Sequence, residues 1–217
     1  MSENLNEIEV RVLGSLVEKQ LTTPEYYPLT MNALTAACNQ KSNRDPIVSY
    51  GDTEILAAVD SLREKNLVYL YYGSTSRAVK YKHMLPGVYH IEPPEVAVIA
   101  VLMLRGPQTL GEIRERTGRL FEFSGIGEVN ETLDGLIGRD EPLIVKLERQ
   151  PGQKEARYAH LLSGEVIADT VVHREKPSSA AVLSDVRYEE LQSEIAEIRN
   201  ELSAFKEMFE EFRKQFD

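Results

Sequence analysis

The chain has 217 residues, of which 42% are hydrophobic and 28% are charged, as in ordinary globular proteins. Its formal net charge of −10 argues against a general polyanion binder, because phosphate neutralisation requires a local surplus of Lys and Arg. The longest apolar run, residues 96–104, has about half the length of a membrane span, and the opening MSENLNEIEV lacks the apolar segment of a secretory signal, so we expect a cytoplasmic protein with no membrane partner.

Residues 1–90 predict three helices followed by a β-hairpin. Apolar residues recur every three or four positions in the helical segments, and Thr30 is a candidate N-cap for the second helix. On the third helix either Ile55 or Leu56 is expected to face inward. The expected helices span residues 6–20, 31–40 and 52–66, and the expected strands span 67–72 and 78–85. This order of elements predicts a winged-helix domain.

The same order returns in residues 91–163, which we interpret as a second winged-helix domain. Pro93 and Pro94 suit the start of its first helix. The expected helices span residues 96–106, 109–118 and 125–139, and the expected strands span 143–149 and 157–163. The residues expected to face inward on the third helix are Ile126, Val129, Leu133, Leu136 and Ile137.

Two hexapeptides support this duplication. KYKHML at 80–85 and RYAHLL at 157–162 both consist of a basic residue, Tyr, any residue, His, an apolar residue and Leu. We interpret them as the same return strand in two repeats. Alternation along a strand then places the Tyr, the His and the final Leu inward, and the intervening residues, Ala159 among them, outward.

The C-terminal quarter of the chain has a different pattern. Residues 164–187 show no sustained period and are predicted to be a linker. Over residues 188–217 apolar side chains follow steps of three and four, which is typical of a coiled-coil helix. The predicted oligomerisation residues are Tyr188, Leu191, Ile195, Ile198, Leu202, Phe205, Phe209, Phe212 and Phe216.

Charges beside this apolar seam favour a parallel homodimer. In a parallel pair, Glu194 and Glu201 face Arg199 and Lys206 of a second copy, whereas antiparallel pairing brings like charges together. The bulky phenylalanines leave a trimer open as an alternative. A single amphipathic helix that docks on its own chain is the remaining alternative.

No residue set predicts catalysis, a metal or a cofactor. The histidines His83, His90, His160 and His173 lack the spacing of a metal site and are expected to be hydrogen-bonded structural residues. Cys38, the single cysteine, excludes an intrachain disulfide and lies on the inward face of a predicted helix, where we expect a small core residue. No nucleophile elbow or Walker-type loop occurs. We therefore expect that the chain is not an enzyme.

The charge distribution argues against standard reading of the DNA major groove. The outward residues of the two third helices include Thr53, Glu54, Ala57, Ser61 and Glu64, and Glu128, Glu131 and Asp134. Carboxylates there meet phosphates and base-edge acceptors with the wrong sign. Basic residues gather instead in the wings, in the first helix-to-helix turn and around the second helix of the second repeat. The candidate contacts to nucleic acid or to a protein partner are Lys41, Arg44, Arg77, Lys80, Lys82, Arg114, Arg116, Arg119, Arg149, Lys154 and Arg157. A solvated surface charge explains each of them equally well when it is taken alone.

The turn NQKSNRDP, residues 39–46, has two interpretations. In the first, its Asn, Ser and Asp side chains cap helix ends and fix the turn. In the second, Lys41 and Arg44 present a contact point to a phosphate or to an acidic partner surface. Both interpretations stay open on the sequence alone.

Three long motifs carry a family resemblance. LTTPEYYPLTMNALTAACNQKSNRDP, GEIRERTGRLFEF and PGQKEARYAHLLSGE resemble the signature stretches of the YceH-like family of bacterial proteins, from about Glu7 to Glu165. The resemblance implies tandem winged-helix domains and a bacterial cytoplasmic origin. It implies no catalytic residues, since no activity is assigned to the family.

Two functions follow as hypotheses. The first is a DNA-associated regulatory protein that contacts duplex DNA through its basic wings and turns, and the fold together with the clustered cations favours it slightly. The second is a protein-interaction scaffold that uses the acidic third helices and the coiled-coil tail.

Overall fold

The computed structural model describes residues 4–72, 78–149 and 155–165. In this part of the chain the fold is α+β and mainly helical, with seven α-helices and two small antiparallel sheets, which confirms the expected class at this level. The predicted coiled-coil helix, residues 188–217, and the predicted linker after residue 165 lie outside the described residues. No helix in the described ranges is long and apolar enough to cross a membrane.

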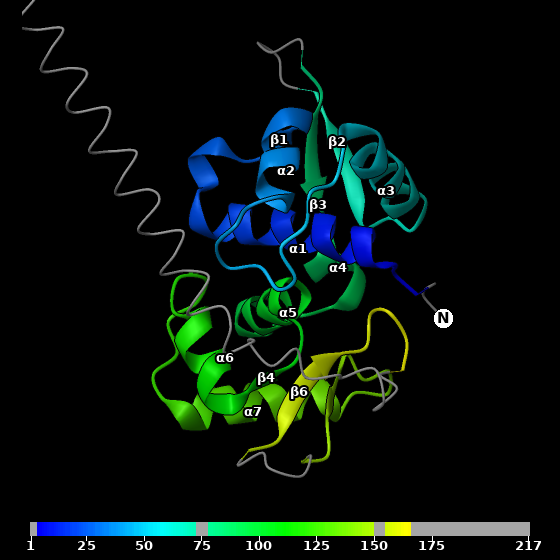
Figure 1. The fold of residues 1–217 in the computed structure, drawn as a ribbon. Coiled ribbons are helices and arrows are strands. Elements are labelled where there is room, and N and C mark those ends of the chain that lie inside the picture. The colour runs from blue at the N-terminus through cyan, green and yellow to red at the C-terminus, as the bar shows by residue number, and fades with distance from the viewer. Residues whose placement is uncertain (1–3, 73–77, 150–154, 166–217) are drawn as a thin grey trace, which may run out of the picture. The chain divides into compact units, whose positions relative to one another are not determined.

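The first half contains three helices and a three-stranded sheet (Figure 1). The helices are α1 (Glu7–Thr22), α2 (Met31–Cys38) and α3 (Asp52–Glu64), and the strands are β1 (Leu29–Thr30), β2 (Val68–Tyr71) and β3 (Lys80–His83). A 3₁₀ helix (Pro24–Tyr26) follows α1, and the short helix α4 (Leu85–Tyr89) follows β3. The middle strand, β3, is antiparallel to both β1 and β2. The expected helices and hairpin are present, and β1 and α4 are additions.

Capping residues explain where the first two helices begin. Asn6 and Glu9 form a capping box at α1: Glu9 N donates to Asn6 Oδ1 at 2.9 Å, and Asn6 N donates to Glu9 Oε2 at 2.7 Å. Thr30 caps α2 as expected, since its Oγ1 accepts a hydrogen bond from Ala33 N at 3.4 Å.

The second half repeats this order. Its helices are α5 (Pro93–Arg105), α6 (Leu110–Thr117) and α7 (Ile126–Ile137), and its strands are β4 (Gln108–Thr109), β5 (Ile144–Lys146) and β6 (Arg157–His160). The strand order β4-β6-β5 matches β1-β3-β2 of the first half. Each half therefore has a central return strand between a two-residue strand and the other strand of its hairpin.

The two return strands occupy equivalent places. Tyr81 in β3 lies opposite one residue of β1 and one of β2, and Tyr158 in β6 lies opposite one residue of β4 and one of β5. Two positions later, His83 and His160 each lie opposite the first residue of the neighbouring hairpin strand. Both tyrosines are buried. The repeated hexapeptides thus mark the same strand in the two halves.

Two side chains differ from their expected orientation, and the choice left open on α3 is settled. Ile126 is 46% exposed instead of inward, because it is the first residue of α7. On α3 the inward residue is Ile55, and Leu56 is exposed, because Ile55 is four positions before the buried Val59. Ala159, expected to face outward, is buried, so β6 is covered on both faces.

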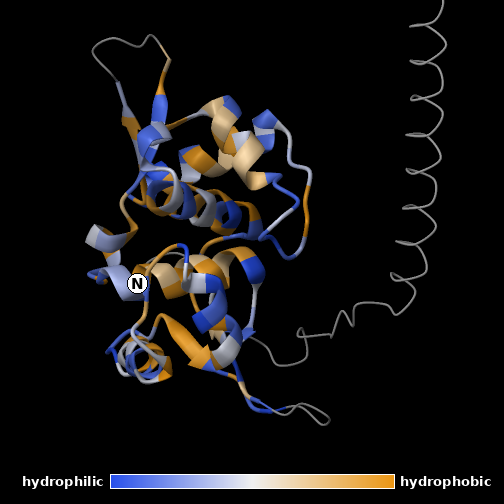
Figure 2. Ribbon diagram, turned by 90° about the vertical axis from the view of Figure 1, so that its left-hand side faces the viewer, coloured by the Kyte–Doolittle hydropathy of each residue, from blue (hydrophilic) through white to orange (hydrophobic). Residues whose placement is uncertain are grey.

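Helices α1 and α5 pack against each other and join the halves (Figure 1). Gly14 permits this close approach, since a Cβ atom there would lie 3.0 Å from Leu104 Cγ and 3.1 Å from Met103 Cβ. Leu5 N also donates to Leu162 O at 2.8 Å. The buried apolar residues form one cluster with members from both halves, and Figure 2 shows apolar segments gathered where helices face one another.

Candidate functional site

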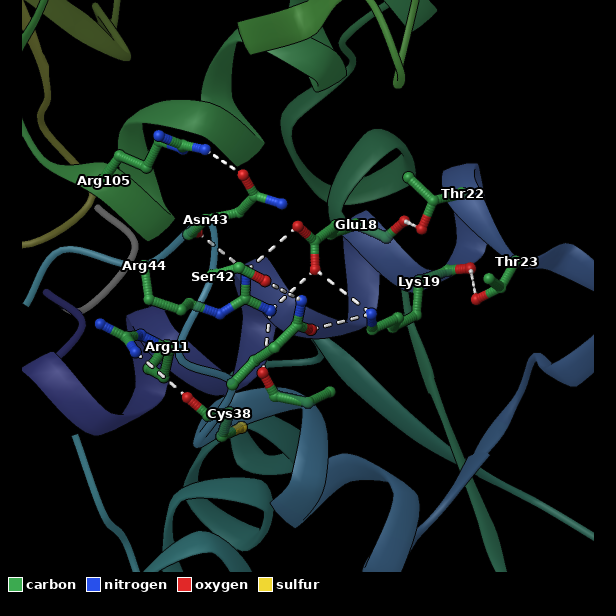
Figure 3. Close-up of polar contacts among 12 residues, drawn as sticks. Arg11, Glu18, Lys19, Thr22, Thr23, Cys38, Ser42, Asn43, Arg44 and Arg105 are labelled. Carbon is green, nitrogen blue, oxygen red and sulfur yellow. Dashed lines mark hydrogen bonds and ion pairs between the residues drawn. The ribbon is translucent and has the colours of Figure 1, made fainter. Parts of the chain in front are cut away.

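A buried arginine holds the turn at residues 39–46. Arg44 Nη1 and Nη2 donate to Oε1 and Oε2 of Glu18 on α1 at 3.1 and 2.7 Å, and the Arg44 side chain is 0% exposed. The same guanidinium donates to Ala37 O at 2.8 Å and to Asn43 O at 2.9 Å (Figure 3). A phosphate or partner surface cannot reach Arg44 in this arrangement. The structure therefore contradicts the predicted contact role of Arg44 and supports the structural interpretation.

A second buried arginine fixes both ends of the same turn. Arg11 on α1 donates to Cys38 O at 3.1 Å (Figure 3) and also to Pro46 O at 2.6 Å. Burial lowers the pKa of Arg11, and the neighbouring charge of Arg44 lowers this pKa further. Two guanidinium groups in the interior thus determine the path of the turn.

The turn also contacts the end of α5. Asn43 has a φ of 59°, and its Oδ1 accepts a hydrogen bond from Arg105 Nη2 (Figure 3). Asp45 N donates to Leu104 O at 2.9 Å. Lys41 is exposed, and no carboxylate of the described chain forms an ion pair with it. The turn therefore connects the two halves and leaves Lys41 available to solvent.

The outer face of the β2–β3 hairpin combines tyrosines with lysines. Tyr69 lies opposite Lys82, and Tyr71 lies opposite Lys80. Tyr69, Tyr71 and the following Tyr72 are 51%, 48% and 70% exposed. Neither lysine forms an ion pair with a carboxylate in the described ranges. This set, Tyr69, Tyr71, Lys80 and Lys82, is called the hairpin face below.

The basic side chains of the β5–β6 hairpin are less available for contact with a partner than those of the first hairpin. Arg157 Nη1 lies 3.0 Å from Glu112 Oε2 and donates to Pro107 O at 2.9 Å, so its charge is largely engaged. Lys146 Nζ lies 5.7 Å from the centroid of the Tyr158 ring. Arg149 is exposed. The remaining candidates of the two wings, Arg77 and Lys154, lie outside the described residues.

The residues that were expected to face outward on the third helices are all exposed or half-buried. On α3, Thr53, Glu54, Ala57 and Glu64 are exposed, and Ser61 is half-buried. On α7, Glu131 and Asp134 are exposed, and Glu128 is half-buried. None of these outward residues is a cation, although Arg63 is also exposed on α3.

Four cations meet in a cleft of about 370 Å³ between α1, the turn, α5 and α6. The cations are Lys19, Arg105, Arg116 and Arg119, and the acids that line the same cleft are Glu18 and Glu115. Two of the predicted contacts, Arg116 and Arg119, thus share one site, while Arg114 is exposed on α6 and does not line it. This set of residues is called the cationic cleft below.

The sequence did not predict two of the four cations of the cationic cleft, nor the two tyrosines of the hairpin face. Lys19 and Arg105 belong to helices far apart in the chain, and no local pattern indicates that they meet. Tyr69 and Tyr71 left a signal, because the alternation in LVYLYY places both of them on the face opposite the core.

His83 and Cys38 are buried, and His160 is half-buried. His90 is exposed, and His173 lies outside the described residues. Burial lowers the pKa of His83 and of His160 to about 4, and for His83 the charge of Lys82 adds to the effect. His83 Nδ1 accepts a hydrogen bond from Leu85 N at 3.3 Å, whereas Nε2 of His83 and Nδ1 of His160 are buried without a partner among the described residues, so the expected hydrogen bonding holds only in part. Burial raises the pKa of Cys38 to about 11, so the thiol stays protonated at neutral pH, in keeping with the expected core role.

Comparison with known proteins gives the family. A family model described as "Protein of unknown function, DUF480" matches residues 5–153. A UPF0502 protein of Geotalea daltonii is 46% identical over 221 aligned residues that cover 100% of both chains. A UPF0502 protein of Opitutus terrae is 53% identical over 163 residues, which cover 75% of this chain and 71% of the relative. A UPF0502 protein of Aliivibrio salmonicida is 46% identical over 206 residues, which cover 91% of this chain and 93% of the relative. In agreement with the resemblance drawn from its motifs, the chain belongs to the bacterial DUF480 family, whose members include the UPF0502 proteins.

Proposed function

We propose that this chain is a non-enzymatic tandem winged-helix protein that associates with duplex DNA through its hairpin face. The observation that supports this most strongly is the pairing of the exposed Tyr69 with the exposed Lys82 and of the exposed Tyr71 with the half-buried Lys80. Lysine ammonium groups and tyrosine hydroxyls both donate hydrogen bonds to phosphate oxygens. A hairpin face on which tyrosines of one strand lie opposite lysines of the other suits the DNA backbone.

The element order supports the winged-helix assignment. In each half, a short strand precedes the second helix, and a hairpin follows the third helix and pairs with that strand. A helix-turn-helix protein normally places its recognition helix in the major groove. The carboxylates on α3 and α7 oppose that arrangement. Contact led by a hairpin removes this conflict, because the acidic helices then stay away from the phosphates.

The first half is the better candidate for the contact. Lys80 and Lys82 have no carboxylate partner in the described ranges, whereas Arg157 in the equivalent strand of the second half is paired with Glu112. Moving an already paired arginine to a phosphate would leave the glutamate without its countercharge.

Binding of a mixed-sequence duplex, measured by fluorescence anisotropy at about 50 and about 150 mM salt, tests the proposal. We expect micromolar or tighter affinity at the lower salt concentration. Lys82→Gln should reduce the slope of log K against log salt by about 1, since one phosphate contact is lost. The matched control Arg63→Gln removes one positive charge from the exposed side of α3 and should leave the slope unchanged. Absence of binding at about 50 mM salt, or equal effects of the two variants, contradicts DNA contact through the hairpin face.

A protein-interaction scaffold is the second candidate function, and the outer side of α3 favours it. Leu56 is 44% exposed on a helix whose other outward residues include Glu54 and Glu64. An apolar residue with acidic neighbours suits a basic protein surface better than it suits DNA. A stoichiometric partner that is retained from nuclease-treated bacterial lysate and lost with Leu56→Glu would support the scaffold. Partners that disappear when nucleic acid is digested would argue against it.

A further inference from the structure

The cationic cleft is separate from the hairpin face and holds more positive charge than its acids neutralise. Glu18 is already bound through both carboxylate oxygens to the buried Arg44, and its Oε2 lies 3.7 Å from Lys19 Nζ. One acid therefore faces two cations. The second acid of the lining, Glu115, is exposed and forms no ion pair within the described ranges.

The arginines of the cleft are incompletely paired. Arg116 Nη2 lies 3.4 Å from Glu112 Oε1, but the same carboxylate also pairs with Arg157. Arg119, two residues beyond the end of α6, has no carboxylate partner in the part of the chain that the structure describes. Arginine is the side chain best suited to bidentate recognition of phosphate. Here Arg116, near the end of α6, and Arg119, just beyond it, both line the cationic cleft.

Arg105 adds a third arginine at the end of α5. Burial lowers its pKa, and the neighbouring charge of Arg116 lowers this pKa further, while Glu18 and Asp45 offset the effect only in part. Within the described residues, its side chain donates a hydrogen bond to the neutral Asn43 rather than to a carboxylate. A bound anion would relieve the repulsion between these arginines.

We propose that the cationic cleft binds a small phosphorylated molecule, with Lys19, Arg116 and Arg119 around the phosphate. A phosphate monoester carries nearly two negative charges at neutral pH and matches this surplus better than a single carboxylate does. Val101 and Leu120 in the same lining provide apolar contact for the rest of the ligand. The cleft volume lies within the range of roughly 300–1,000 Å³ that is typical of small-molecule sites.

The expected ligand would contact both halves, because the cleft includes Lys19 from α1 and Arg116 from α6. A ligand that binds only the folded chain stabilises it by mass action. Thermal unfolding and calorimetric titration of the full chain therefore both report binding. The probes are inorganic phosphate, pyrophosphate and adenosine 5′-monophosphate, with adenosine as the uncharged comparison.

Arg119→Gln is the decisive variant, since Arg119 has no partner in the described ranges whose loss would disturb the fold. We expect saturable binding of at least one phosphorylated probe, no binding of adenosine, and an affinity about tenfold weaker in Arg119→Gln. Arg114→Gln, an equal change of charge at an exposed position of α6 outside the cleft, is the matched control and should leave the affinity unchanged.

Three outcomes would overturn this inference. One is the absence of saturable binding of every phosphorylated probe at about 10 mM, which corresponds to less than about 3 kcal/mol of binding free energy. Another is an equal loss of affinity in Arg119→Gln and Arg114→Gln, which would indicate nonspecific surface charge. The third is complete displacement of the probe by duplex DNA, which would assign the cleft to the DNA backbone. Failure of the hairpin-face proposal would leave this site intact, because the two share no residue.

Discussion

Glu18 Oε2 and Arg44 Nη2 lie 2.7 Å apart in an ion pair whose arginine side chain is 0% exposed. The pair joins the middle of the turn at residues 39–46 to α1, and the turn in turn bonds to the end of α5. Taking two charges out of water is costly, so removal of one partner leaves the other in an unfavourable state. The position of the turn therefore depends on both side chains.

Glu18→Ala should lower the free energy of unfolding by about 3–5 kcal/mol, because the buried guanidinium of Arg44 loses its countercharge. Asp60→Ala removes a carboxylate from the exposed pair with Arg63 and should cost less than about 1 kcal/mol. Urea unfolding of both variants measures the difference. Equal and small losses would show that the buried pair does not hold the turn.

The helices and hairpins were predictable, whereas the pairings between them were not. Helix α2 follows from local spacing and from the cap at Thr30, and the return strands follow from alternation around Tyr81 and Tyr158. Glu18 and Arg44 are 26 positions apart, and nothing in their local pattern reveals that both are withdrawn from solvent. A sequence gives the charge of an arginine but not its burial, and burial decides whether that arginine is a contact residue.

The cationic cleft illustrates the same limit. Arg116 and Arg119 are predictable as candidates because they lie close together in the sequence. Their association with Lys19 and Arg105 depends on the packing of α1, α5 and α6, which is a tertiary property. Helical periodicity indicates which face of each helix is buried, but it does not indicate which helix covers that face.

Gly14→Val should destabilise the chain by about 1–3 kcal/mol, because its side chain would overpack the contact between α1 and α5. Even a Cβ at this position would lie only 3.0 Å from Leu104 Cγ and 3.1 Å from Met103 Cβ. Both neighbours are buried and have little room to move. Thermal unfolding of the variant measures the loss.

Gly135→Ala on α7 is the matched control for this substitution. The nearest atom to a Cβ there is Glu95 Oε1 at 3.9 Å, an ordinary contact distance. Replacing a glycine inside a helix should then raise stability by about 0.5–1 kcal/mol. If Gly14→Val were as stable as the parent chain, α1 and α5 would be able to separate at no cost, and the close approach would not matter.

Stability should fall as the pH decreases from about 6.5 towards 4. Burial lowers the pKa of His83 and His160 to about 4, whereas in the unfolded chain the histidine pKa is about 6.5. Between these values the unfolded state binds more protons than the folded state, so acidification favours unfolding by up to about 1.4 kcal/mol per pH unit for each histidine. Above about pH 6.5 this contribution is fully present and independent of pH.

The contribution of Glu9 to the pH dependence of stability falls in a different pH range from that of the two histidines. Burial raises the pKa of Glu9, but hydrogen bonds from Lys65 and other groups outweigh burial and give a net lowering, so the stabilisation from Glu9 is lost only below its usual range near 4.5. Urea unfolding at about pH 5 and about pH 7 therefore isolates the histidines. His83→Phe keeps a ring against Tyr27, and both His83→Phe and His160→Phe should flatten the pH dependence. An unchanged slope in both variants would contradict the assignment.

Removal of residues 188–217 should convert a homo-oligomer into a monomer in analytical ultracentrifugation. The expectation comes from the three-and-four spacing of apolar residues in a segment that lies outside the described residues. Leu202→Asp places a charge in the predicted apolar seam and should have the same effect as the truncation. Ala196→Asp introduces the same charge at a position outside the seam and should leave the oligomer intact. An unchanged mass after truncation would refute the coiled coil, and equal effects of the two aspartates would show that net charge rather than the seam controls association.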